Sequence, residues 1–277
     1  MTFVPEGSAM RKLALSTVVV SILVVCGTAG AVGPAATSVV VQRGQPVQIA
    51  FANDLSGFAQ DFGASFSNAI QMALAAHPKI KGFDVQLNIV DAPCGDPAAD
   101  VAAAAAIVAN PQNVGVLGQV CSFGFDAALP LYETAGLAVI SGSATQPDLS
   151  AFGPSVFNRT IVDDDGFSDW FPLVDVLPSV VAWRQAYQIQ FGVAPLPFAE
   201  FYFDAANLLL RRVHQVSRKV HGNLVIDRSE LARAVRQTVN FKGVTCSITL
   251  DPSTGDRVSD PAALDRCSEA DGDKGDG

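Results

Sequence analysis

The sequence predicts an α/β protein built on a doubly wound parallel sheet. Short, near-continuous apolar segments alternate along the chain with longer segments whose apolar residues recur at helical spacing. Strands that alternate with helices in this way form parallel sheets joined by right-handed crossovers. Of the 277 residues, 49% are hydrophobic and 16% are charged, so the chain can bury a sizeable core.

The first half of the predicted sheet contains two strands and two helices. Residues 47–52 form a strand whose near-continuous apolar character indicates burial on both faces. A helix over 59–76 follows, with its aromatic and aliphatic residues on one side. Residues 83–90 alternate apolar with polar and predict a second strand. A turn at 91–97 then leads into an alanine-rich helix over 98–110.

The second half of the predicted sheet is organised around the stretch 118–124, Gly-Gln-Val-Cys-Ser-Phe-Gly. A strand over 114–117 leads into it and a helix over 123–134 leads away. A fourth strand over 137–140 ends in the polar segment 141–147. A tight turn between a strand and a helix leaves backbone N–H groups unpaired at the positive end of the helix dipole, which suits an anion. The sequence therefore predicts a site for the carboxylate of a small ligand.

Three predicted loops at the same sheet edge carry hydroxyl groups. Ser56 follows the first strand, Ser122 the third, and Ser143 and Thr145 the fourth. Ligands of open α/β sheets bind beyond the carboxyl ends of the strands, so these loops predict a pocket. Each hydroxyl taken alone also fits an ordinary capping role.

The charge balance excludes one class of partner. The formal net charge is −9 and the isoelectric point is about 4.7. Nucleic-acid binding depends on a basic face, so we expect no nucleic-acid partner.

The N-terminus predicts export from the cytoplasm. Residues 1–31 read as a signal peptide, because Arg11-Lys12 precede an apolar segment over 13–25 that is short for a membrane span. Two processing patterns compete: cleavage after Ala31, and a lipoprotein-like box that would lipidate Cys26. Either pattern predicts a periplasmic or cell-envelope location.

The cysteines predict disulfides rather than a metal site. Four cysteines remain after Cys26, an even number that suits an oxidising compartment and allows three pairings. We favour Cys94–Cys121 and Cys246–Cys267. The three histidines are scattered and no CxxC occurs, so we predict no metal and no cofactor.

Four motifs in a fixed order give the sequence a specific resemblance. They are Asp-x-Pro-Cys-x-Asp-Pro at 91–97, Gly-x-x-Cys-Ser at 118–122, Ile-Ser-x-Ser-Ala-Thr-x-Pro-Asp-Leu at 140–149, and Val-Phe-Asn-Arg-Thr at 156–160. Together they resemble the branched-chain amino-acid (leucine, isoleucine, valine) binding proteins of ABC importers, two-lobed proteins of the periplasmic-binding-protein-like type I fold. The resemblance implies an exported solute receptor that delivers an amino acid to a membrane permease.

The resemblance also implies roles for particular residues. The disulfide that bridges two loops in the family matches Cys94 and Cys121, and would stabilise the fold by about 3–4 kcal/mol. Family residues that surround the ligand correspond to four positions here: Phe62, Ser122, Ser143 and Thr145.

The resemblance implies that most of the family's second lobe is absent. After 156–160 the chain reaches segments resembling the end of that lobe almost at once, and the acidic residue and tyrosine that complete the ligand cage have no counterpart. We therefore expect weakened ligand binding. The predicted division is a signal peptide (1–31), a tether (32–46), the first α/β lobe (47–162), a linker remnant of the second lobe (163–192), C-terminal helices and a hairpin that complete the first lobe (193–260), and an acidic disordered tail (261–277).

Three alternatives to a transport receptor follow from the same residues. An enzyme with Ser122 as nucleophile is disfavoured, because Gly-x-x-Cys-Ser is not a nucleophile elbow and no histidine is placed as a base. A single-lobe interaction module would self-associate through an exposed interlobe face formed by Trp170-Phe171 and residues 198–203. A non-functional truncated copy fits every residue quoted.

Overall fold

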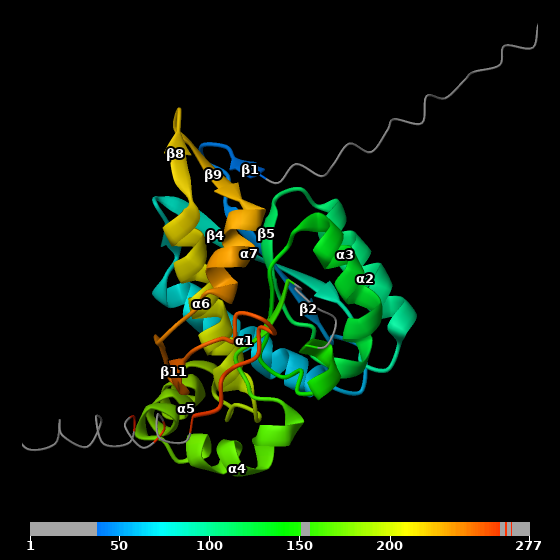
Figure 1. Ribbon diagram of the computed structural model, residues 1–277. Coiled ribbons are helices and arrows are strands. Elements are labelled where there is room, and N and C mark those ends of the chain that lie inside the picture. Colours follow the sequence, from blue (N-terminus) through cyan, green and yellow to red (C-terminus); the bar gives the residue numbers. More distant parts are fainter. Residues whose placement is uncertain (1–37, 151–155, 261–263, 265–266, 268–277) are drawn as a thin grey trace, which may run out of the picture. The chain divides into compact units, whose positions relative to one another are not determined.

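A six-stranded sheet forms the centre of the fold in the computed structural model, which describes residues 38–150, 156–260, Leu264 and Cys267 (Figure 1). Its strands, in spatial order, are β3 (Lys79–Ile80), β4 (Phe83–Asp91), β2 (Val47–Asn53), β5 (Asn113–Leu117), β6 (Val139–Ser141) and β7 (Phe157–Arg159). All of them run parallel except β3, which pairs antiparallel with β4. The predicted doubly wound parallel sheet is confirmed.

Helices cover both faces of this sheet. α1 (Gln60–Ala76) and α6 (Ala199–Val216) pack together on one face, and α2 (Pro97–Ala109) and α3 (Phe125–Ala135) pack together on the other. The strand β2 shows why the two layers differ: Ile49 and Phe51 point into the larger cluster. Ala50 and Ala52 point toward the alanine-rich α2, where small side chains allow close packing.

The helix boundaries follow from local capping chemistry. The carboxylate of Asp96 accepts hydrogen bonds from the N–H groups of Ala98 and Ala99, both at 3.1 Å, and Pro97 occupies the first helical position of α2. α3 ends at Gly136, which adopts a left-handed conformation with φ of 63°.

The predicted linker at the start of 163–192 is wrong. The Asp163 carboxylate accepts a hydrogen bond from the N–H of Gly166 at 3.1 Å and begins α4 (Asp164–Asp175). Acidic residues in the first turn of a helix are stabilised by the positive end of its dipole, so the run Asp163 to Asp165 favours a helix start rather than a linker. α5 (Pro178–Phe191) follows, and residues 160–198 contain these two helices and no strand.

The prediction of an exposed interlobe face is also wrong, because its central residues Trp170 and Phe201 are buried. Trp170 is 2% exposed and Phe201 is fully buried, with their ring centroids 5.7 Å apart. Phe171 lies 4.8 Å from Phe167 and 5.6 Å from Phe198, measured between ring centroids. These aromatic residues therefore form a small core between α4, α5 and the start of α6.

The predicted tether over 32–46 is wrong at residues 38–41, which form strand β1 (Ser38–Val41). β1 pairs with β9 (Asn223–Asp227) in a three-stranded antiparallel sheet that also contains β8 (Arg218–Val220), and α7 (Arg228–Arg236) follows β9. Val39 and Val41 are buried opposite Ile226 and Leu224. Alternating burial in a valine run is typical of a strand, and the small residues around it obscured the signal.

A short hairpin, β10 (Phe241–Gly243) and β11 (Cys246–Ile248), closes the described fold. The second predicted disulfide, Cys246–Cys267, is present, with the two Cα atoms 5.8 Å apart. The prediction of a disordered tail over 261–277 is therefore wrong for Cys267, and also for Leu264, which is 3% exposed beside Trp170.

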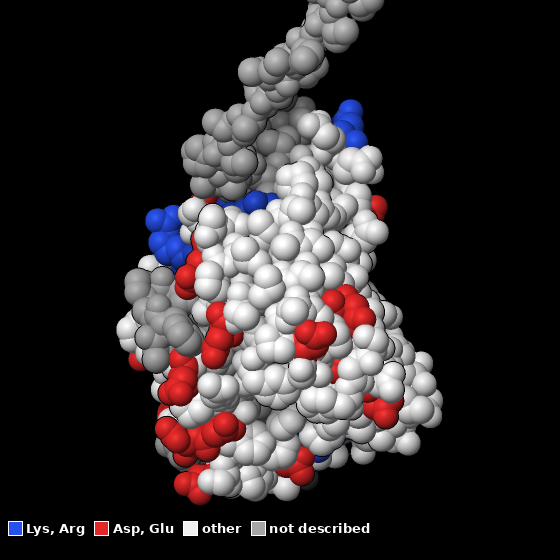
Figure 2. Space-filling view, turned by 90° about the vertical axis from the view of Figure 1, so that its right-hand side faces the viewer, with Lys and Arg blue, Asp and Glu red and all other residues white. Residues whose placement is uncertain are grey.

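The remaining sequence predictions concern the N-terminus, membrane spans, metal sites and surface charge. The signal peptide and Cys26 lie outside the described residues. Within the described ranges, no helix combines the length and apolarity needed to cross a bilayer, and no group of three or more potential ligands is placed to hold a metal ion. Figure 2 shows the side carrying α2 and α3: Asp and Glu are spread over its lower half, and most of the surface is uncharged.

Candidate functional site

A cavity of about 240 Å³ lies beyond the carboxyl ends of β2, β5 and β6. In the strand order, β4 lies on one side of β2 and β5 on the other, so the chain changes direction across the sheet at this point. Ligands of doubly wound sheets bind at such switch points. Its lining comes from α1 and the turn before it, the loop after β5, the loop after β6 and the start of α6: Ala59, Phe62, Phe66, Val120, Cys121, Ser122, Phe123, Ser143 and Phe198.

The loop after β5 has its shape fixed at both ends. Gly118 adopts a φ of 100°, and a Cβ atom there would overlap the carbonyl oxygen of Ala52 on the neighbouring strand, so only glycine fits. The disulfide implied by the resemblance, Cys94–Cys121, is present with the Cα atoms 5.7 Å apart. A 3₁₀ turn over Ser122–Gly124 precedes α3, so the predicted helix over 123–134 begins two residues later than expected.

Ser122 is placed to donate a hydrogen bond into the cavity. Its Oγ accepts hydrogen bonds from the N–H groups of Thr145, at 3.1 Å, and Gln146, at 3.3 Å. A serine hydroxyl has two acceptor positions and one donor hydrogen, so both acceptor positions are used. Its hydrogen has no acceptor among the described residues. Ser122 therefore joins two loops and keeps one donor for a ligand.

Ser143, unlike Ser122, has its hydroxyl hydrogen already bound within the protein. Its Oγ donates to the carbonyl oxygen of Val120 at 2.6 Å and lies 3.0 Å from the hydroxyl of Tyr202. Tyr202 is fully buried, and burial raises its pKa to about 12, so it stays protonated. With its hydrogen committed to Val120, Ser143 offers the cavity an acceptor rather than a donor.

Two of the predicted site residues do not line the cavity. Thr145 supports it from behind: its N–H binds Ser122, and its carbonyl oxygen accepts a hydrogen bond from the N–H of Asp164 at 2.8 Å. Ser56 is exposed and donates to the carboxylate of Asp91 at 2.7 Å. Contact of either residue with a ligand stays a prediction.

Four phenylalanine side chains line the cavity. Phe62 and Phe66 lie 6.0 Å apart between ring centroids, and Phe66 stacks on Tyr202 at 4.5 Å. At the rim, Phe123 stacks on Phe58 at 6.2 Å, and these two side chains are 49% and 76% exposed. Phe66 and Tyr202 were not among the predicted site residues, because their segments show only helical periodicity in the sequence. Phe123 lies in the predicted site stretch 118–124, but the sequence assigned its ring no role.

Asp54 fixes the turn between β2 and α1. Its buried carboxylate accepts three backbone N–H groups, from Gly57 at 2.5 Å, Ala59 at 3.0 Å and Cys94 at 3.1 Å. These bonds hold the turn before α1 against the disulfide loop. These three backbone N–H groups occupy most of the acceptor positions of the Asp54 carboxylate, and the carboxylate does not line the cavity.

Arg159 anchors the loop after β6. Its fully buried guanidinium donates to the carbonyl oxygens of Ala144, at 3.3 Å, and Gln146, at 3.0 Å. Its Nε donates to the carboxylate of Asp256 at 2.7 Å, which supplies the counter-charge that a buried cation requires. The loop that carries Ser143 is therefore held in place by an ion pair from the C-terminal segment.

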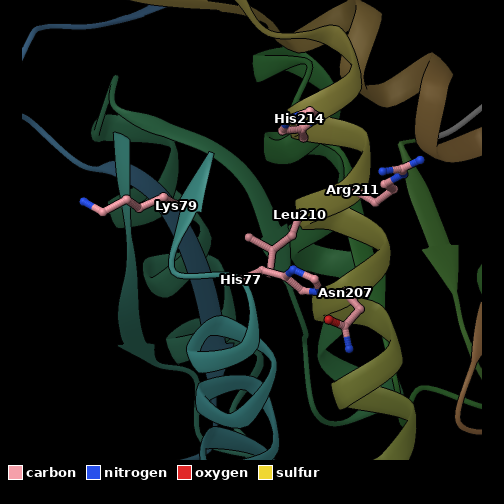
Figure 3. A pocket seen from close by; sticks show the side chains of 6 residues that line it. All are labelled: His77, Lys79, Asn207, Leu210, Arg211 and His214. Atoms are coloured by element: carbon pink, nitrogen blue, oxygen red, sulfur yellow. The ribbon is translucent and has the colours of Figure 1, made fainter. Parts of the chain in front are cut away.

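A second cavity, of about 310 Å³, lies between α6 and the segment joining α1 to β3. Its lining includes four basic or imidazole side chains from outside the predicted site, but they do not converge. Figure 3 shows the Lys79 and Arg211 side chains pointing away from one another, with His77 and Asn207 between them. Lys79 is also paired with Asp84 at 2.5 Å. The basic side chains of this cavity therefore do not converge on a common ligand position.

Comparison with known proteins points to one class of transport protein. No protein-family profile matches the chain. The Leu/Ile/Val-binding protein of Escherichia coli K12 is 31% identical over 119 residues, which are 42% of this chain and 32% of that protein. The chain resembles the branched-chain amino-acid-binding proteins of ABC transporters. The match thus spans about a third of the length of this relative.

Solved structures show the same fold. A branched-chain amino acid ABC transporter protein from Rhodospirillum rubrum aligns over 78% of this chain and 96% of its own, with a TM-score of 0.67 and 17% identity. A solute-binding protein from Rhodopseudomonas palustris, solved with 3,4-dihydroxy benzoic acid, aligns over 77% of this chain and 91% of its own, with a TM-score of 0.64 and 13% identity. The resemblance predicted from the motifs is confirmed, and the structural neighbours establish the fold.

Proposed function

We propose that this chain is the exported solute-binding component of an ABC importer for amino acids of the branched-chain type. The observation that carries the proposal is the cavity at the switch point of the sheet. Ser122 presents an unpaired hydroxyl hydrogen there, suited to a carboxylate, and Phe62 and Phe66 supply a wall suited to an aliphatic side chain.

The proposal includes weak binding by this chain. In the described residues, the cavity lining contains no charged side chain that would pair with the ammonium of an amino acid. The segment between β7 and α6 contains the two helices α4 and α5. We interpret it as lacking the second α/β lobe that the resemblance implies. A lost charge-assisted hydrogen bond weakens binding by about 1.5–3 kcal/mol, or roughly ten- to hundredfold. A site of the micromolar class would thus fall toward the millimolar range.

Two further parts of the proposal rest on the resemblance and on the N-terminal sequence. The partner is a membrane permease, and the location is the periplasm or cell envelope. Mass spectrometry of the N-terminus of the exported protein separates cleavage after Ala31 from lipidation of Cys26. An unprocessed N-terminus would contradict export through residues 1–31.

Isothermal titration and thermal-shift measurements with leucine, isoleucine and valine test the proposal. We expect saturable stabilisation with dissociation constants in the millimolar range. Phe62→Ala should abolish the effect, whereas Ile189→Ala, an exposed position on α5, should leave it unchanged. Low-micromolar binding would contradict the weakening. No response to any of the three amino acids at tens of millimolar would contradict the transport function.

A further inference from the structure

We propose that the cavity prefers apolar monocarboxylates without an ammonium group, such as the α-keto acid analogues of leucine and phenylalanine, over the free amino acids. The inference rests on the proposed function, because it assigns a substrate class to the same site. It follows from which charges reach the cavity, which hydrogen-bonding groups face it and what covers its walls.

The nine lining side chains are all uncharged. Three carboxylates on elements that border the cavity have other roles. Asp54 accepts three backbone N–H groups of the adjacent turn. Asp100 lies beneath Gly124, where a Cβ atom would overlap its carboxylate, on the side of the loop that faces α2. Glu200 follows Phe198 by two residues but is fully buried and bound by Arg184 at 2.5 Å. No acid is therefore among the described residues that line the cavity.

The hydrogen-bonding groups that face the cavity compensate an ammonium group poorly. Ser122 offers a donor hydrogen, since both of its acceptor positions are occupied. Ser143 offers one neutral acceptor position, because its hydrogen binds Val120. An ammonium group has three donor hydrogens and a full charge to satisfy, so entry into this cavity would leave most of its hydration uncompensated. An α-keto acid keeps the carboxylate and avoids that cost.

The walls favour a large apolar group on the ligand. Phe62, Phe66, Phe123 and Phe198 line the cavity, and the exposed ring of Phe58 extends the rim. Burial of an aliphatic or aryl group against these rings removes apolar surface of both partners from water. The cavity volume of about 240 Å³ suits a small carboxylic acid. The Rhodopseudomonas palustris neighbour, solved with an aromatic carboxylic acid, shows that this fold accommodates such a group.

The test compares matched ligand pairs on the full chain at neutral pH. Isothermal titration is run with leucine and its α-keto acid, and with phenylalanine and phenylpyruvate. We expect each keto acid to bind at least tenfold more tightly than its amino acid. Equal binding, or tighter binding of the amino acids, would overturn the inference and leave the proposed function standing. Binding of none of the four ligands would overturn both.

A charge placed at the rim gives a second test. Phe123 is half-exposed, so replacement by a polar residue there is compatible with folding. Phe123→Asp should shift the ratio of keto-acid to amino-acid affinity at least tenfold toward the amino acid, compared with Phe123→Asn, which removes the same ring without adding charge. An unchanged ratio between these two variants would overturn the inference that the lack of a carboxylate at the cavity sets the ligand preference.

Discussion

The disulfide Cys94–Cys121 allows a prediction that separates stability from ligand response. We propose the double variant Cys94→Ala/Cys121→Ala, with Cys246→Ala/Cys267→Ala as its matched control. The two disulfides close loops of similar length, with sequence separations of 27 and 21 residues. Only the first one holds a loop that lines the cavity, since Cys121 is part of the lining.

The expected losses follow from the entropy that a closed loop removes from the unfolded chain. For separations of 27 and 21 residues, the chain-entropy relation gives about 3.6 and about 3.3 kcal/mol at room temperature. For a protein of this size, 1 kcal/mol corresponds to roughly 2–4 °C in Tm, so each double variant should melt about 7–14 °C lower. Both variants should therefore lose similar stability.

Chemical denaturation gives the stability loss, and a thermal shift with the α-keto acid of leucine gives the ligand response. We expect the Cys94/Cys121 variant to lose ligand stabilisation, because the 121–123 segment is no longer pinned to the turn at Cys94. The control variant should retain that response. A loss below about 1 kcal/mol in the first variant, or an equal ligand response in both variants, would refute the reasoning.

Three further predictions concern buried groups. Burial, with added repulsion from Asp96 and Asp54, raises the pKa of Asp100 to about 6. The folded chain then binds more protons than the unfolded chain between about pH 4 and pH 6, so stability falls as pH rises through this window. Asp100→Asn should remove that fall in urea unfolding curves, and an unchanged pH profile would contradict it. Gly63→Ala places a Cβ against the carbonyl oxygen of Asp54 and should cost about 1–3 kcal/mol by denaturation; a neutral effect would show that α1 can shift. Asp204→Ala leaves the hairpin N–H groups and the buried Arg257 without their carboxylate and should cost about 3–5 kcal/mol, with Asp204→Asn costing less. Equal losses in these two variants would indicate that the charge is unimportant.

The sheet and its helices could be predicted because their signals are local. The strand at 47–53 is a continuous apolar run, and the helix at 97–109 has an aspartate cap followed by proline, so period and capping agree. The order of motifs then placed Cys94, Ser122 and Ser143 at one edge of that sheet. The structure brings Ser122 and Ser143 together with Phe62 in one cavity.

The errors arose where a segment's partner is distant in sequence. Strand β1 depends on pairing with β9, almost two hundred residues away by sequence, and its four residues carry little information alone. The burial of Trp170 depends on Phe201 and on Arg257, whose guanidinium lies 4.4 Å above the Trp170 ring. Aromatic residues in such segments looked exposed because nothing nearby in the sequence covers them.

The sequence also could not predict which serine of the site donates a hydrogen bond to a ligand and which accepts one. Two serines after parallel strands look equivalent in the sequence. The structure makes Ser122 a donor and Ser143 an acceptor, through Thr145 and Gln146 in one case and Val120 in the other. This difference depends on how two loops meet, and it carries the proposed choice between ligands.

The most direct test of the central claim is an amide NMR titration of the full chain with the α-keto acid of leucine. We predict saturable chemical-shift changes at the 120–123 loop, at Ser143 and at Phe62. Changes confined to the second cavity, around His77 and His214, or no saturable changes in the described residues, would contradict the claim that the switch-point cavity is the ligand site.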